Sequence, residues 1–242
     1  MTERRPAEVG LVGRRGLRAG LASLEGLVWL ARVGPAPVEA WACAMGWGRS
    51  AAFSHARRLE REGWLVRYPM LRGQGSLLAA SSLGVRMAGV AVSPARVPAP
   101  TWWAHLRACG WVAAWLTVRG RVMMGCREVE DDPSWRGEVQ WSDRRGRHRV
   151  GHRPDLVVRG TTPVEVELAR KSDARLAGVM GMYRGWVAAD RIPGVMYVVE
   201  SRADAERIRR TAARHELNVR VELLEAIVAQ ALEASRAQTA TP

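Results

Sequence analysis

The apolar positions of the first 62 residues recur at helical spacing in three successive segments. Side chains three and four residues apart predict a first helix over about 23–33, which Gly34–Pro37 ends. A short second helix is expected over 38–45. A third begins at Arg49 or Ser50, runs to Glu62 and stops at Gly63. The amino-terminal part of the chain is therefore expected to begin with three helices.

A pair of strand-like segments follows these helices. Trp64–Tyr68 reads as a strand, Arg72–Gly75 as a hairpin tip and Ser76–Ala79 as the return strand. A further helix is expected from about Ser82. Three helices, a two-stranded hairpin and a last helix give the order of a winged helix-turn-helix, a DNA-binding fold. We assign this domain to residues 1–92.

The third helix has two different faces. On a helical wheel Ala52, Phe53, Ala56 and Leu59 gather on one side, while arginine and serine side chains gather on the other. A basic, hydroxyl-bearing face suits a helix in the major groove, where arginine binds guanine edges or phosphates. The predicted DNA-binding residues are Ser50, Ser54, Arg57, Arg58 and Arg61 on this helix, with Arg67 and Arg72 on the wing. A solvated helix face on a fold used for protein contacts is the alternative.

A proline-rich linker over 93–101 separates this unit from residues 102–242, where strands alternate with helices. The pattern predicts helices over 102–118, 172–188 and 203–215, strands over 122–128, about 138–141, 148–158, 164–168, 195–199 and 219–223, and a helical tail from Glu225. The core order of this second domain is αβββαβ. We therefore expect a mixed α/β protein of two domains.

Charge and composition indicate the class of partner. The formal net charge is +13 and the isoelectric point about 11.2, which favours double-stranded DNA. No apolar run approaches the roughly 20 residues that span a bilayer, and no secretory signal opens the chain, so we expect a cytoplasmic protein without a membrane partner. Cys43, Cys109 and Cys126 are widely spaced, which favours apolar filling over a disulfide framework or a structural zinc site. The sequence lacks a P-loop.

The acidic residues of the second domain suggest chemistry. In Val164–Leu168 acidic and apolar residues alternate, so Glu165 and Glu167 share one strand face, about 7 Å apart. If the strands pair through the turn at 160–163, Asp155 lies near Glu165. Neighbouring carboxylates repel each other unless a cation bridges them, and Mg²⁺ is the natural cation. Asp155 and Glu165 are thus candidate metal ligands. A rim of acids paired with Arg153, Arg159 and Arg170 is the alternative.

The segment His152–Arg153–Pro154–Asp155, followed by Glu165–Val166–Glu167 on an αβββαβ order, resembles the PD-(D/E)XK nuclease superfamily. The resemblance implies a catalytic set of Asp155, Glu165, Glu167 and Lys171. Glu167 occupies the usual lysine position, which departs from the pattern. Lys171, the only lysine of the chain, is a candidate for a migrated one. The resemblance implies that the residue in the lysine position, Glu167 or Lys171, orients or deprotonates the attacking water.

Both halves together resemble the replication-relaxation family of plasmids, phages and integrative elements. The resemblance rests on the winged helix, a helix with Trp102, Trp103 and His105, the His-x-Pro-Asp and Glu-Leu-x-x-Lys segments, and Tyr183. It implies a DNA-binding accessory role in replication or relaxation. An active Mg²⁺-dependent endonuclease and a winged-helix transcription regulator are the alternatives. A homodimer and other replication or relaxosome proteins are open as partners, and Mg²⁺ is expected only if the site is active.

Overall fold

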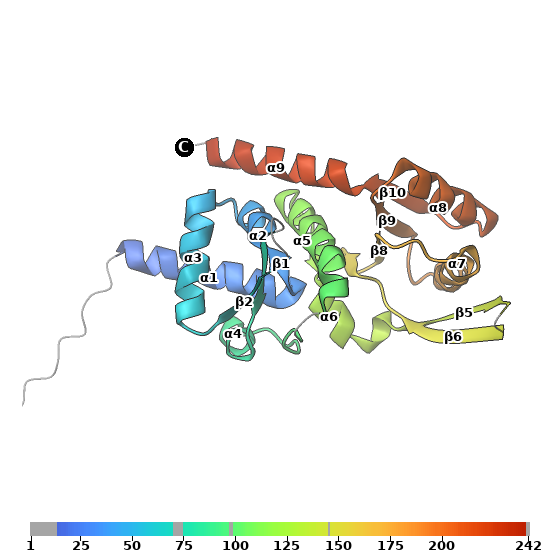
Figure 1. The fold of residues 1–242 in the computed structure, drawn as a ribbon, viewed down its shortest axis with the longest axis horizontal. Coiled ribbons are helices and arrows are strands. Elements are labelled where there is room, and N and C mark those ends of the chain that lie inside the picture. The colour runs from blue at the N-terminus through green and yellow to red at the C-terminus, as the bar shows by residue number, and fades with distance from the viewer. Residues whose placement is uncertain (1–13, 70–74, 97–98, 145, 241–242) are drawn as a thin grey trace, which may run out of the picture.

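A computed structural model describes residues 14–69, 75–96, 99–144 and 146–240. The predicted wing residue Arg72 lies outside these residues. In the described part of the chain, no helix combines the length and the apolarity that crossing a membrane requires. The protein is mixed α/β and has an amino-terminal lobe and a sheet-containing lobe, which lie at opposite ends of Figure 1.

The amino-terminal lobe contains helices and one small antiparallel sheet. Its elements are α1 (Arg14–Val33), β1 (Ala36–Pro37), α2 (Val38–Ala44), α3 (Arg49–Arg61), β2 (Leu65–Pro69), β3 (Ser76–Ala80) and α4 (Ser82–Ala88). The strands lie in the order β1-β3-β2, and Leu65 of β2 pairs with Ala80 of β3. Gly63 follows α3 with a φ of +72°, a conformation that glycine adopts without strain. The predicted end of the third helix is confirmed, whereas the first helix starts nearer the amino terminus than predicted.

The second lobe contains the larger sheet. After a 3-10 turn (Pro100–Trp102) its elements are α5 (Trp103–Val118), β4 (Met123–Met124), α6 (Cys126–Asp131), a 3-10 turn (Pro133–Trp135), β5 (Gly137–Asp143), β6 (Gly146–His152), β7 (Leu156–Val158), β8 (Thr162–Glu167), α7 (Asp173–Ala188), β9 (Val195–Val199), α8 (Arg202–Arg214), β10 (Val219–Leu223) and α9 (Leu224–Ala240). The strand order is β10-β9-β8-β7-β4. Strands β8, β9 and β10 are parallel, while β7 is antiparallel to β8 and to β4.

Two sequence predictions in this lobe were wrong. The strand predicted over 122–128 is only the two-residue β4, and α6 replaces its second half. The carboxylate of Glu128 accepts the backbone N–H of Gly125 at 2.8 Å, which stabilises the first turn of a helix rather than a strand. The strand predicted over 148–158 is divided at Arg153–Pro154 into β6 and β7. Strand β6 pairs with β5 in a separate hairpin that packs against α7.

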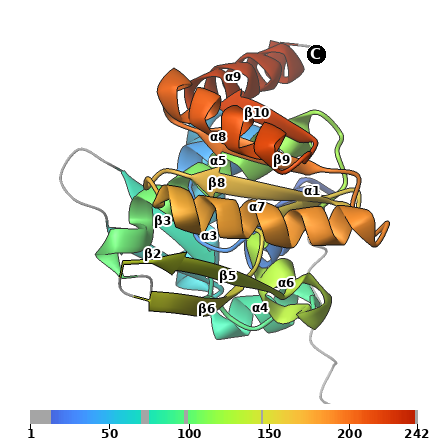
Figure 2. The same ribbon diagram turned by 90° about the vertical axis from the view of Figure 1, so that its right-hand side faces the viewer.

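Helices cover both faces of the large sheet. Alternate residues of the strands face opposite sides, so Leu156 and Val164 pack toward α5 while Val157 and Tyr197 pack toward α7 and α8. Figure 1 shows α5 between the sheet and the amino-terminal lobe, and Figure 2 shows α7 in front of the sheet. The sheet is therefore the middle of three layers.

One apolar cluster joins the two lobes. It contains Trp41 of α2, Val112 of α5, Val164 of β8 and Ile227 of α9, all of them almost inaccessible to solvent. The approach is closest at Gly110 of α5, where an added Cβ would lie 2.8 Å from the Cβ of Ala36. Helix α9 packs along α5 and reaches α2 (Figure 1). The two lobes therefore share a core.

Polar contacts across the same boundary add to this packing. The Cys43 thiol on α2 donates to the Ala231 carbonyl of α9 at 2.9 Å. Arg32 of α1 donates to the Met123 carbonyl at 2.7 Å and to Glu128 at 2.9 Å. In the predicted linker, the Ser93 carbonyl accepts two hydrogen bonds from Arg127 of α6. The segment that joins the lobes is thus held against the second lobe at its start.

Candidate functional site

The register between β7 and β8 places Asp155 beside Glu165. Leu156 pairs with Val164, and the Asp155 backbone N–H donates to the Val164 carbonyl at 2.9 Å. The predicted pairing of these strands is therefore confirmed. Glu165 and Glu167 are only 3 % and 4 % exposed, because β8 is the central strand of the sheet. Two carboxylates buried to this degree need partners that offset the loss of hydration.

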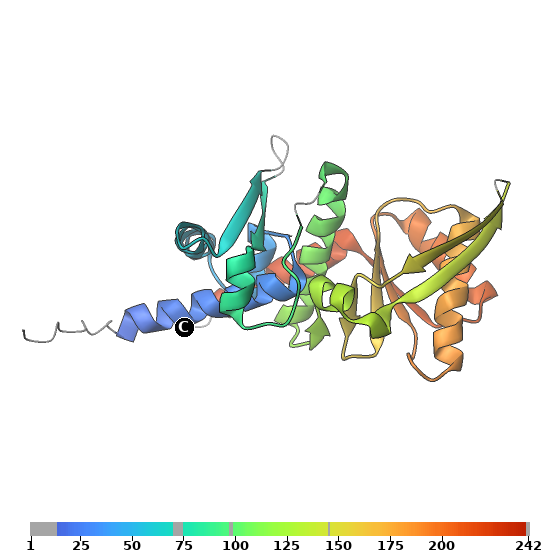
Figure 3. The same ribbon diagram turned by 90° about the horizontal axis from the view of Figure 1, so that it is seen from below.

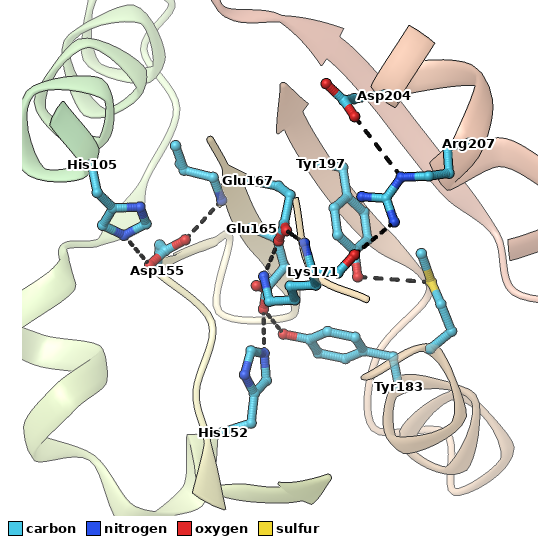
Figure 4. A network of polar contacts seen from close by, with 12 residues as sticks. His105, His152, Asp155, Glu165, Glu167, Lys171, Tyr183, Tyr197, Asp204 and Arg207 are labelled. Atoms are coloured by element: carbon cyan, nitrogen blue, oxygen red, sulfur yellow. Dashed lines mark hydrogen bonds and ion pairs between the residues drawn. The ribbon is translucent and has the colours of Figure 1, made fainter. Parts of the chain in front are cut away.

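Asp155 is bound through both carboxylate oxygens. Its Oδ2 accepts the backbone N–H of Val166 at 2.7 Å, and its Oδ1 lies 2.8 Å from Nε2 of His105 on α5. Burial by itself lowers the pKa of His105, but the hydrogen bond and the charge of Asp155 outweigh burial and leave the pKa raised. Asp155 thus links the sheet to α5 through a histidine that favours its charged form (Figure 4).

Glu165 is bound by two side chains from other elements. His152, at the end of β6, places Nε2 2.7 Å from Glu165 Oε1, and the hydroxyl of Tyr183 on α7 donates to the same oxygen. Burial acts to raise the pKa of Glu165, but the charge and hydrogen bond of His152 lower it overall. Burial also acts to lower the pKa of His152, and Glu165 reverses that shift. Each partner therefore favours the charged form of the other.

Glu167 is paired with Lys171, the only lysine of the chain. The ammonium contacts Glu167 Oε2, and the Lys171 backbone N–H donates to Oε1 at 3.2 Å. Burial lowers the pKa of Lys171, although the charges of Glu165 and Asp155 act in the opposite direction. Lysine fits here because its compact ammonium reaches a carboxylate four residues back within the sharp turn that precedes α7.

The three acids therefore have three separate basic partners in His105, His152 and Lys171 (Figure 4). This arrangement differs from the expected pocket in which carboxylates share an ion. Mg²⁺ prefers oxygen ligands, yet the side chains that contact Asp155 Oδ1 and Glu165 Oε1 include the imidazoles of His105 and His152. The donor set as arranged does not fit Mg²⁺. Its chemistry is that of a buried network of ion pairs that joins α5, β6 and α7 to the sheet.

A different set of side chains has the spacing of metal ligands. Within the described residues, His105, Cys109 and Asp155 are the one group of three or more such side chains whose ligand atoms all lie within 4.8 Å of one another. They lie in a cleft of about 710 Å³, which Arg136 and Arg153 also line. Asp155 thus belongs both to the acidic network and to this cluster. From sequence, His105 was used only for the resemblance to the replication-relaxation family, and Cys109 was interpreted as an apolar filler. Their proximity to Asp155 could not be predicted, because it depends on how α5 packs against the sheet.

The predicted DNA-binding residues divide into two groups. Ser50, Ser54, Arg57 and Arg61 lie on the exposed face of α3, opposite the buried Ala52, Ala56 and Leu59. Two arginines are instead engaged by glutamates. Arg58 pairs with Glu62 at 3.1 Å, and Arg67 pairs with Glu60 at 2.7 Å and donates to Ser76 at 3.0 Å. Of the predicted residues on α3, two arginines and two serines are therefore exposed.

Comparisons with known proteins supply no family for this chain. No protein-family model matches it, and neither does a curated protein or a solved structure.

Proposed function

We propose that this protein binds double-stranded DNA through α3 and acts as an accessory protein in the replication or relaxation of a plasmid, phage or integrative element. The order of elements in the amino-terminal lobe supports a winged helix-turn-helix, since α1, β1, α2 and α3 precede the β2–β3 hairpin and the strands lie in the order β1-β3-β2. In such domains the last helix before the hairpin enters the major groove.

The exposed face of α3 carries the proposal. Arg57 and Arg61 are four residues apart, one helical turn, and Ser50 and Ser54 lie on the same side. Arginine binds guanine edges or phosphates, and serine hydroxyls bind phosphates. The opposite face is buried through small side chains, Ala52 and Ala56, which bring the helix close to the lobe. The net charge of +13 supports the same class of partner.

The second lobe supports an accessory role rather than cleavage. Its main-sheet elements follow the order α5, β4, β7, β8, α7 and β9, which is an αβββαβ order compatible with a PD-(D/E)XK-like domain. Its hairpin adds the exposed Arg144 and Arg147 to the basic surface, while Arg149 pairs with Glu138. Figure 3 shows that the β5–β6 and β2–β3 hairpins project toward the same side of the molecule. We therefore assign phosphate contacts to this lobe.

A Mg²⁺-dependent endonuclease is the second candidate. The observation that favours it is the register that sets Asp155 beside Glu165. The observation that opposes it is the set of protein partners that these carboxylates already have. We therefore place binding ahead of cleavage.

The test is DNA binding by a double variant of α3. Replacing Arg57 and Arg61 with alanine should weaken binding to duplex DNA and flatten the slope of log K against log[salt] by about one for each lost phosphate contact. The matched control replaces Arg210 and Arg214, two exposed arginines of α8 at the other end of the molecule. Equal effects of the two pairs, or an unchanged slope in the α3 variant, would remove α3 from the interface.

A further inference from the structure

The floor of the cleft between α5, α6 and the segment before β7 brings together nitrogen, sulfur and oxygen donors. His105 and Cys109 are four residues apart on α5, so both project from the same side of the helix. Nε2 of His105 lies 3.5 Å from Sγ of Cys109 and 2.8 Å from Oδ1 of Asp155. Helix α5 and the segment before β7 are distant in sequence, yet they place three ligand atoms close enough together to bind one ion.

A second cysteine, on a third segment, lies beside this group but outside the 4.8 Å within which the ligand atoms of His105, Cys109 and Asp155 all lie. Cys126, the first residue of α6, forms a side-chain hydrogen bond with Cys109 and lines the same cleft. Two thiols, an imidazole and a carboxylate are a ligand set found in tetrahedral zinc sites. Spacing alone does not indicate this set, because the rest of α5 and β4 separate Cys109 from Cys126 and no Cys-x-x-Cys pair is formed.

The spacing of the donors matches a tetrahedral ion of this class. Zinc bonds of about 2.0–2.3 Å to nitrogen, oxygen and sulfur place neighbouring ligand atoms about 3.3–3.8 Å apart. The separation of 3.5 Å between His105 Nε2 and Cys109 Sγ lies in this range. The His105–Asp155 hydrogen bond of 2.8 Å would lengthen by about half an ångström when an ion replaced the shared proton.

We propose that His105, Cys109 and Asp155 bind a transition-metal ion of the zinc class, with Cys126 moving in as the fourth ligand. Thiolate and imidazole ligands select such ions over Mg²⁺, which prefers oxygen. The backbone N–H of Val166 already holds the second oxygen of Asp155, which fixes the orientation of the carboxylate toward the ion. His105 and Asp155 are about a quarter and a fifth exposed, so the cleft offers a path of entry.

The bound ion would connect three segments, α5, α6 and the turn before β7, beside the shared core. Its binding would release protons, because cysteine binds a metal as the thiolate. A coordinating thiol gives up its proton to the metal. None of the four ligands lies on α3, so the metal site and the proposed DNA binding can be tested independently of each other.

The test uses Co²⁺ as the probe, on the full-length protein kept reduced and stripped of metal with a chelator. One equivalent of Co²⁺ should give the thiolate-to-cobalt charge-transfer absorption and the visible bands of a tetrahedral ion, and Zn²⁺ should abolish both. Cys109→Ala should lose the charge-transfer band, and Cys126→Ala should reduce it. The matched control is Cys43→Ala, since Cys43 is the remaining cysteine, is buried like Cys109, and packs against α9 instead. Its spectrum should equal that of the unmodified protein.

Metal-dependent stability gives a second readout. Zn²⁺ should raise the Tm of the unmodified protein and of Cys43→Ala, but not that of Cys109→Ala. If Cys109→Ala does not fold, His105→Ala tests the same site, because this side chain is partly exposed. Absence of the charge-transfer band in the unmodified protein would overturn the site. So would a band that survives in both Cys109→Ala and His105→Ala, and an unchanged band in Cys126→Ala would overturn the four-ligand form.

Discussion

Nε2 of His152 lies 2.7 Å from Oε1 of Glu165, in a part of the sheet where Glu165 is 3 % exposed. The histidine comes from the end of β6, whose hairpin lies outside the main sheet, and the glutamate from its central strand. The contact therefore fixes the β5–β6 hairpin to the sheet. It also makes the stability of the protein depend on pH in a direction that can be worked out.

Stability should fall as the pH rises from neutral. The pKa of His152 is raised in the folded protein, so its contribution is complete below the ordinary imidazole value of about 6.5 and is lost as the pH passes the folded value. His152→Gln should flatten this decline in a plot of Tm against pH. The decline in Tm that remains in His152→Gln is assigned to His105, whose pKa is also raised in the folded protein. An identical plot for the variant would contradict the charged pair. At the acidic end, the lowered pKa of Glu165 makes its contribution complete above about 4.3 and lost as the pH falls further.

Tyr183→Phe should destabilise the protein by about 1.5–3 kcal/mol. The substitution removes only the hydroxyl that donates to Glu165, and hydrogen bonds to charged groups contribute about this much. The free energy of unfolding in urea measures the loss. Tyr68→Phe on β2 is the control, and it should cost less because Tyr68 lies in the other lobe, away from the buried acids. Equal losses at the two tyrosines would show that the Glu165 contact contributes nothing of its own.

Lys171→Met should cost about 3–5 kcal/mol, because it leaves Glu167 buried without its cation. Replacing both partners should cost less than replacing Lys171 alone, since an apolar pair carries no uncompensated charge. Chemical denaturation of Lys171→Met, Glu167→Met and the double variant gives the coupling energy. Additive losses would mean that the two side chains do not depend on each other.

Gly110→Val should destabilise both lobes together. A Cβ at this position would lie 2.8 Å from Ala36 and 2.9 Å from Pro37, so α5 must shift away from the amino-terminal lobe. We expect a lower Tm and faster limited proteolysis. Gly181→Val on α7 is the comparison for the loss of helical glycine, because no atom lies within 4 Å of its added Cβ. If both variants behaved alike, the close approach at Gly110 would not matter for stability.

Supercoiled plasmid incubated with Mg²⁺ or Mn²⁺ should be bound but not nicked. The reason is that Asp155 and Glu165 are held by His105 and His152. Agarose gels report nicking and mobility shifts report binding on the same samples. Nicking that disappears in Asp155→Ala would support the endonuclease candidate in place of the accessory role.

The sequence predicted local features well and long-range ones poorly. Periodicity located α3 and its exposed face, and the turn at 160–163 located Asp155 beside Glu165. Sequence reasoning missed α6, because the Glu128 carboxylate caps the start of this helix and outweighs the strand propensity of Cys126–Asp131. It also missed the partners of the acids. His105 lies 50 residues before Asp155, and only the packing of α5 on the sheet brings them together.

Helix α9 has a consequence for the order of assembly. The Cys43 thiol and the Ala231 carbonyl that accepts its hydrogen bond are 188 residues apart. During synthesis, α2 leaves the ribosome long before α9, the helix that packs against it. The amino-terminal lobe therefore reaches its final packing only after the rest of the chain has been translated.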